Sequence, residues 1–389
     1  MNRNLILMAL SLMTWGVGEG MFIFFQPLYL QELGASPVEI GGILGIMGLA
    51  MTVAHLPAGF LADRIGRRPM IIAAWLLGTL SAWIMALSNS LPVFIIGNTL
   101  YGLTAFVVSP MNSYITAARG SLSVGRVLTL ISATYNVGSI LGPLLGGWIG
   151  NRAGLKTNFL VAACIFMVSA AIVFFLRPQP VQPRQEEPGQ RSWRNSGKAV
   201  LTPRFVQFLA IVFIATFSMF LPQQLSPNFL QNERGINLAQ MGQLLAGRAA
   251  GVVVLNLVVG QMNARVGFLL AHLGIASFAT LLWQGGGFPA YALGYFLLGS
   301  YHTARSMVVA QGRTLVNAAN MGLAYGMIET TAAMVVILAP PLAGILYDLD
   351  PPLVYPISLG LIGFSLIMAL FFSPVCSRDM RVELPEEST

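Results

Sequence analysis

Long apolar stretches are the feature that most limits what this chain can fold into. A helix that crosses a lipid bilayer needs roughly 20 consecutive apolar residues, and the sequence of 389 residues supplies about twelve such stretches. A transmembrane β-barrel would need short strands of alternating polarity, which the continuous apolar run at residues 160–176 does not provide. We therefore predict an all-α integral membrane protein with transmembrane helices near residues 5–30, 37–59, 70–88, 92–116, 127–150, 158–176, 204–230, 238–262, 267–284, 289–311, 322–346 and 353–373.

Charged residues are too scarce for a water-soluble globular protein. They make up 9% of the chain, against about 25% in soluble domains, so the lipid bilayer is the solvent for most of its surface. The net charge of +7 does not indicate nucleic-acid binding, because 16 of the 21 Lys and Arg residues fall in the loops on the side of the N-terminus. By the positive-inside rule, we place both termini in the cytoplasm and the protein in the cell (inner) membrane, as a multi-pass protein.

A polar segment at residues 177–203 divides the chain. It is rich in Pro, Gln, Arg and Glu, and because such a composition cannot bury a core, we predict a cytoplasmic linker there. The linker separates an N-terminal six-helix bundle at residues 1–176 from a C-terminal six-helix bundle at residues 204–375. A cytoplasmic tail at residues 376–389 completes the predicted organisation.

A charged loop, GFLADRIGRRPM, joins the second and third spans at residues 59–70. A degenerate copy of its first part follows the eighth span at residues 260–267, so the two halves echo each other in sequence. Two parallel six-helix repeats around an in-membrane site are an architecture of transporters. We therefore predict two six-helix bundles, related by a pseudo-two-fold repeat, around a central cavity.

A second motif lies in the fifth span. Glycines four residues apart clear one helix face for close packing, and a proline between them weakens the helical hydrogen-bond ladder. A role in transport and ordinary small-residue packing between helices are both open as interpretations. The residues of this helix-five packing motif are Gly138, Gly142, Pro143, Gly146 and Gly147.

Through these two motifs, the chain resembles the major facilitator superfamily over its whole length. The motif in the fifth span is similar to one found in the family's drug/proton antiporters, although the fourth span lacks the arginine that those proteins often carry before the pair at residues 101–102. The resemblance implies a 12-helix secondary transporter that works by alternating access. The loop matches the family signature between helices two and three at Gly59, Leu61, Ala62, Asp63, Arg64, Gly66, Arg67 and Arg68.

The resemblance further implies that the charged loop is a gate. Asp63 can accept hydrogen bonds from Arg67, four residues later, and from the N-terminus of helix eleven near residues 320–323. This latch would form when the cytoplasmic side is closed. The alternative interpretation is a plain topology anchor with solvated charges. The expected gating motif is Gly59, Asp63, Arg64, Gly66, Arg67 and Arg68.

Four charged residues lie inside the predicted spans: Glu19, Arg248, Arg305 and Glu329. A charge at the centre of a membrane helix costs about 2.5–3.5 kcal/mol on insertion scales, so each needs a partner or a wet cavity. At about 1.5 Å of rise per residue, Arg305 and Glu329 lie at the same depth, and we expect an ion pair. That pair either takes part in proton coupling or permanently locks the C-terminal half.

Glu19 and Arg248 lie near mid-membrane in opposite halves, where they face each other or the solute. Burial disfavours the charged form of a carboxyl group, so we expect Glu19, and after it Glu329, to carry the coupling proton. The alternative is that Glu19 is a static partner of Arg248. Polar and aromatic residues at helical spacing complete the expected substrate cavity, which comprises Trp15, Glu19, Phe22, Gln26, Tyr101, Asn112, Tyr135, Gln223, Gln224, Arg248, His302, Arg305 and Glu329.

The sequence carries no motif of an enzyme. It has no phosphate-binding loop, neither Cys164 nor Cys376 has metal-ligand spacing, and we expect no metal and no cofactor. We expect a monomer that binds a small-molecule substrate and protons or another coupling ion. The favoured function is proton-coupled efflux, and the alternative is import or facilitated passage of a polar or anionic solute such as a sugar or organic acid. A non-transporting membrane receptor and a membrane-embedded enzyme are remote alternatives.

Overall fold

The computed structural model describes residues 2–179, 201–316 and 321–372, with the backbone alone at residues 56–63 and 322. Every regular element in these ranges is a helix, in agreement with the predicted fold class. The first group of helices is α1 (Arg3–Phe22), α2 (Gln26–Glu32), α3 (Pro37–Ile65), α4 (Arg67–Leu87), α5 (Leu91–Leu103), α6 (Val108–Ala117) and α7 (Val124–Phe174). The second group is α9 (Pro203–Phe220), α10 (Ser226–Arg234), α11 (Leu238–Val259), α12 (Ala264–Gln284), α13 (Phe288–Leu298), α14 (Ser300–Gly312), α15 (Met321–Leu349) and α16 (Val354–Phe372).

Within the described ranges, 10 helical segments are long and apolar enough to cross a membrane, and the predicted count of about twelve differs for two local reasons. The helix α7 contains the predicted fifth and sixth spans, which Gly154 separates with a φ of +81°. The predicted tenth span consists of α13 and α14, which meet at Gly299 and are each too short to span alone. Each predicted span therefore corresponds to helical structure in the described residues.

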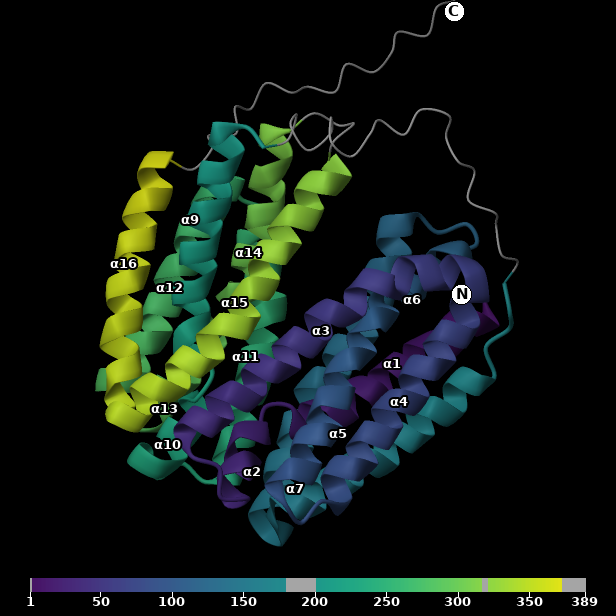
Figure 1. The fold of residues 1–389 in the computed structure, drawn as a ribbon, viewed down its shortest axis with the longest axis horizontal. Helices are drawn as coiled ribbons and strands as arrows, with labels where there is room; N and C mark the ends of the chain where they lie inside the picture. The colour runs from purple at the N-terminus through teal and green to yellow at the C-terminus, as the bar shows by residue number, and fades with distance from the viewer. Residues whose placement is uncertain (1, 180–200, 317–320, 373–389) are drawn as a thin grey trace, which may run out of the picture.

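The two groups of helices form two bodies (Figure 1). Most of the predicted linker, at residues 180–200, and the predicted tail lie outside the described residues. We call the side of the molecule where α1 and α9 begin the linker end, and the opposite side, where α2 and α10 lie, the closed end. The bodies meet at the closed end and diverge toward the linker end (Figure 1).

Glycines bring the two bodies together at the closed end. Helix α3 crosses α15 there, and a Cβ atom on Gly48 would lie 2.8 Å from Val336 Cγ1. Helix α7 crosses α11 in the same way, since a Cβ atom on Gly242 would lie 3.0 Å from Gly147 Cα. Real Cβ atoms do not approach other atoms so closely without displacing them, so these crossings depend on the missing side chains.

The helix-five motif also packs α7 against α1. A Cβ atom on Gly146 would lie 2.9 Å from the Met21 carbonyl oxygen, and one on Gly142 would lie 2.8 Å from Gly20 Cα. Gly138 likewise packs on the backbone of α1, and both Pro143 and Gly147 contact Gly242 of the opposite body. The predicted small-residue packing is therefore present, and it also reaches across the two halves.

Large apolar side chains cover the outside of both bodies. Leu87, Val258 and Phe371 expose 62%, 63% and 77% of their surface. Apolar exposure on this scale marks a membrane-contacting surface. The bilayer, and not water, is therefore the medium in which these helices are stable.

Candidate functional site

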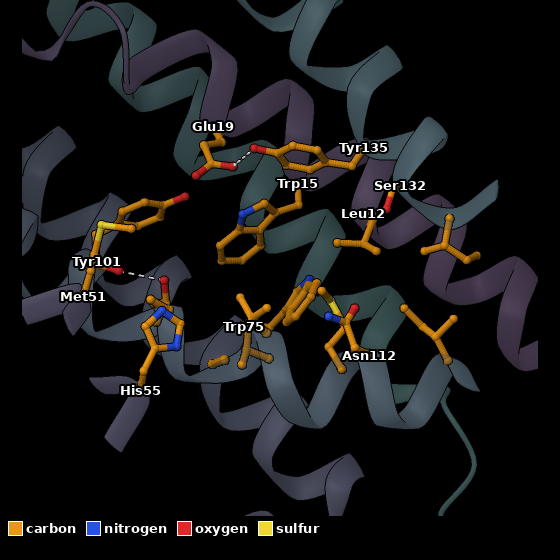
Figure 2. A pocket seen from close by; sticks show the side chains of 18 of the residues that line it. Leu12, Trp15, Glu19, Met51, His55, Trp75, Tyr101, Asn112, Ser132 and Tyr135 are labelled. Atoms are coloured by element: carbon orange, nitrogen blue, oxygen red, sulfur yellow. Dashed lines mark hydrogen bonds between the residues drawn. The ribbon is translucent and has the colours of Figure 1, made fainter. Parts of the chain in front are cut away.

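A cavity of about 330 Å³ lies within the N-terminal body. Figure 2 shows its lining from α1, α3, α4, α5, α6 and α7, with Glu19 and Tyr135 on one side and His55 on the other. We call it the N-terminal cavity. Its polar and aromatic lining residues are Trp15, Glu19, His55, Trp75, Tyr101, Thr104, Asn112, Ser132 and Tyr135.

Glu19 is the acidic residue of this cavity. The hydroxyl of Tyr135 donates a hydrogen bond to Glu19 Oε2 at 2.7 Å, which joins α7 to α1 (Figure 2). Among the described residues, Glu19 forms no ion pair with a basic side chain. The predicted alternative, a static pair with Arg248, is therefore absent from this structure.

Aromatic rings surround the carboxylate. Trp15 lies 4.9 Å from Trp75 and 6.1 Å from Tyr101 between ring centroids. The indole nitrogen of Trp75 donates to Ser169 at 2.8 Å, so this polar group is already satisfied inside the bundle. The remaining ring surfaces offer apolar contact and cation–π attraction to a ligand next to Glu19.

A second cavity, of about 340 Å³, lies between the two bodies. We call it the interhalf cavity. The guanidinium of Arg248, from α11, lies 4.8 Å from the ring centroid of Phe24 in the N-terminal body. In the part of the chain that the structure describes, no carboxylate forms an ion pair with Arg248. The polar residues that line the interhalf cavity are Gln26, Gln223, Gln224, Ser226, Arg248 and Tyr295.

Two glutamines of the interhalf cavity differ in their bonding. Gln26 Nε2 donates to Asn98 Oδ1 and is held within the N-terminal body. Gln223 Nε2 donates to the Met219 carbonyl oxygen at 2.7 Å, but its Oε1 atom is buried without a hydrogen-bond partner. A buried acceptor without a partner is unfavourable, so this oxygen is available to a donor group on a ligand.

The expected ion pair in the C-terminal half is present. Arg305 of α14 donates to Glu329 of α15 at 2.6 Å, with 41% and 58% of the two side chains exposed. Neither residue lines the N-terminal or the interhalf cavity, and neither does the exposed His302. These three predicted cavity residues therefore belong to the lining of neither cavity.

Phe22 was predicted to line the cavity, but it is 1% exposed and packs 4.9 Å from the ring of Tyr101 in the core of the N-terminal body. The reason is local, because Phe22 still lies in α1 but its ring packs in an aromatic cluster with Tyr101, Phe159 and Phe166. The sequence analysis missed many of the residues that line the N-terminal cavity, among them Met51, His55 and Trp75. These three belong to no motif, and only the packing of α3 and α4 brings them to the cavity.

The charged loop makes its described contacts within the N-terminal body. Gly66 has a φ of +94° and precedes α4. Arg67 donates to the Ser113 carbonyl oxygen at 3.5 Å, and Arg68 donates to the Phe174 carbonyl oxygen at 3.0 Å. The predicted latch needs Asp63 and the start of helix eleven at residues 320–323, and the side chain of Asp63, residue 320 and the side chain of residue 322 lie outside the described parts of the structure.

Comparisons with known proteins agree with this architecture. The family model described as Major Facilitator Superfamily matches residues 6–311. Multidrug resistance protein 2 of Bacillus subtilis (strain 168) is 22% identical over 369 residues, which cover 91% of this chain and 90% of that protein. An uncharacterized MFS-type transporter of Methanocaldococcus jannaschii is 27% identical over 183 residues, and this match spans 46% of the chain and about half, 47%, of that relative.

The fold is also found among solved structures. The crystal structure of the nucleoside transporter NupG superposes with a TM-score of 0.77 at 12% sequence identity. The superposition covers 95% of this chain and 98% of that chain. At this identity the similarity concerns the fold alone.

Proposed function

The chain belongs to the major facilitator superfamily, and from this premise we propose that it is a proton-coupled exporter of small organic compounds. The single observation that carries the proposal is Glu19, a carboxylate inside the membrane body that lines a cavity and has no basic partner among the described residues. Proton coupling needs such a group, because it must accept either a proton or a cationic solute.

The energetic argument for coupling starts from the cost of an unpaired charge within a membrane helix. On insertion scales that cost is about 2.5–3.5 kcal/mol, so the binding of a proton or a cation, which neutralises the Glu19 carboxylate, is favoured. A proton neutralises it from one side of the membrane, and a cationic solute competes for the same oxygens from the other side. Competition for one carboxylate exchanges the two ligands, and the hydrogen bond from Tyr135 holds the carboxylate where both can reach it.

Alternating access follows from the arrangement of the two bodies. They meet at the closed end through the crossings of α3 with α15 and of α7 with α11. Basic residues such as Arg67, Arg68 and Arg119 lie at the opposite, linker end, which we place in the cytoplasm by the positive-inside rule. This geometry corresponds to a state that takes up solute from the cytoplasm. The name of the Bacillus subtilis relative, a multidrug resistance protein, favours export over import.

The test is solute-induced proton flux in proteoliposomes across a panel of organic cations, with a pH-sensitive dye inside. We expect flux with the wild type and with the control variant Glu32→Gln, which changes an exposed carboxylate at the closed end. We expect no coupled flux with Glu19→Gln. Equal proton flux in the wild type and in Glu19→Gln would reject Glu19 as the coupling residue.

Import or facilitated passage of a polar or anionic solute is the second candidate. The observation in its favour is Arg248, which lines the interhalf cavity without a carboxylate partner in the described residues. Its signature is uptake of an anionic solute without any change in internal pH. An absence of anion uptake, together with cation-driven proton flux, would eliminate this candidate.

A further inference from the structure

The two cavities adjoin. Met47 and Met51, both on α3, belong to the lining of the N-terminal cavity and of the interhalf cavity. Volumes of about 330 and 340 Å³ each lie near the lower limit for ligand pockets, roughly 300–1,000 Å³, and together they fall well within it. A solute that extends past the two methionines occupies both.

The charges of the two cavities are opposite. Among the described lining residues, Glu19 is the one Asp, Glu, Lys or Arg side chain of the N-terminal cavity, and Arg248 is its counterpart in the interhalf cavity. The other titratable lining groups are His55, Tyr101 and Tyr135 in the first and Tyr295 in the second. The two charges do not form an ion pair with each other. Each is therefore available to a group of opposite charge on the solute.

The separation of the charges sets the length of such a solute. Glu19 and Phe24 are five residues apart along α1 and the turn after it, which corresponds to about 8 Å at the helical rise. The Arg248 guanidinium lies 4.8 Å from the Phe24 ring. The distance to be bridged is thus on the order of 10 Å along the chain direction. A compact amino acid is too short, whereas a compound with an apolar spacer is long enough.

The N–H donors around Arg248 favour an anionic group of the solute in the interhalf cavity. Arg248 and Gln224, which both carry N–H donors, line the same cavity. The Phe24 ring covers one face of the guanidinium, which leaves its N–H edge to donate. A guanidinium edge binds a carboxylate with two parallel hydrogen bonds, so this end fits an anionic group.

We infer that the two cavities form one binding site for an amphoteric organic solute, with its cationic group against Glu19 and its anionic group against Arg248. The inference rests on the proposed transport function and specifies the substrate class. Such a solute neutralises both charges within the membrane body at once. A compound with only one charge leaves either Glu19 or Arg248 without a partner. It therefore binds more weakly than the amphoteric solute, and this difference in affinity produces the selectivity.

The experiment compares three matched compounds by calorimetric binding to the purified full-length protein: 4-(4-aminobutyl)benzoic acid, its methyl ester and its N-acetyl derivative. The ester retains the cation alone, and the N-acetyl compound retains the anion alone. We expect the amphoteric acid to bind at least tenfold more tightly than either derivative. Similar affinities for all three compounds would overturn the inference.

Three variants test which side chains produce the preference. Arg248→Gln should bind the acid no more tightly than the ester while keeping its affinity for the ester, which also shows that the variant is folded. Arg248→Lys should retain part of the preference. Glu19→Gln should remove the preference over the N-acetyl compound. Arg152→Gln is the control, because Arg152 packs on Trp148 outside both cavities and should change nothing.

Binding and transport fail separately. If the acid binds with the expected preference but drives no proton flux in proteoliposomes, the proposed function is wrong and the substrate class stands. If another compound drives proton flux while the tenfold preference is absent, the substrate class is wrong and the proposed function stands. A preference that survives both Arg248→Gln and Glu19→Gln would also overturn the inference, because the two charges would then not select the solute.

Discussion

Asn228 of α10 donates a hydrogen bond to Gln31 Oε1 of α2 at 2.7 Å and thereby joins the two bodies at the closed end. Asn228 also donates to the Pro27 carbonyl oxygen at 3.1 Å, and Asn232 exchanges hydrogen bonds with the same Gln31 amide. These contacts can exist only while α2 and α10 touch. They form a polar latch on the side of the molecule opposite the linker end.

We predict that Gln31→Ala weakens this latch. One net hydrogen bond contributes about 0.5–1.5 kcal/mol, and a loss of about 1 kcal/mol changes a population ratio roughly fivefold. Spin labels at positions 32 and 233, both exposed at the closed end, should report a larger fraction of long distances in the variant. Gln243→Ala, on the exposed face of α11, is the control and should leave the distances unchanged. An unaltered distance distribution in Gln31→Ala would mean that the latch does not hold the closed end.

The close packing of α7 on α11 leads us to a second prediction about the closed end. A Cβ atom on Gly242 would lie 3.0 Å from Gly147 Cα, so Gly242→Val must push the helices apart. Overpacking of this kind costs about 1–3 kcal/mol, and we expect transport to fall at least tenfold because the closed end no longer closes. Gly247→Val on the same helix is the matched control, since a Cβ atom there meets nothing within 4 Å. Equal transport by the two variants would contradict the prediction.

Elements that depend on regular repetition could be predicted from the sequence. The spans follow from run length, and the ion pair of Arg305 with Glu329 followed from counting equal depth along two helices. The packing face of Gly138, Gly142 and Gly146 followed from their spacing of four residues. In each case the prediction depends only on the spacing of residues along a helix, because the rise and rotation per residue are fixed.

The site could be predicted only in part. Glu19 and Trp15 were identified, but Phe22 was misplaced because its ring packs against Phe159 and Phe166 of α7 in the core of the N-terminal body. His55 and Trp75 reach the cavity through the rotation of α3 and α4, which depends on packing that no motif encodes. The glycines at positions 41, 45 and 48, which contact α15, were a usable signal for the interface between the halves, because small residues at helical spacing favour close crossings.

The hydrogen bond from Tyr135 to Glu19 gives a prediction for the N-terminal cavity. Tyr135→Phe removes the donor at 2.7 Å and keeps the ring, so the carboxylate is no longer held in place. Hydrogen bonds to charged groups contribute about 1.5–3 kcal/mol, and we expect the KM for a cationic solute to rise about tenfold or more. Tyr291→Phe is the control, because that hydroxyl donates to the Gly285 carbonyl oxygen away from the cavity. An unchanged KM in Tyr135→Phe would show that Glu19 does not need this support.

The ion pair of Arg305 with Glu329 either stabilises the C-terminal body or takes part in proton coupling, and variants of Glu329 distinguish these two roles. Its side chains are 41% and 58% exposed, so we expect the pair to contribute about 1 kcal/mol or less to stability. Because Arg305 already neutralises Glu329, we predict that Glu329→Gln keeps solute-induced proton flux in proteoliposomes and lowers the melting temperature slightly. The exchanged pair, Arg305→Glu with Glu329→Arg, should recover the melting temperature of the wild type. A folded Glu329→Gln variant that binds solute but releases no protons would instead assign the coupling proton to Glu329, and Glu19 would then be a substrate ligand alone.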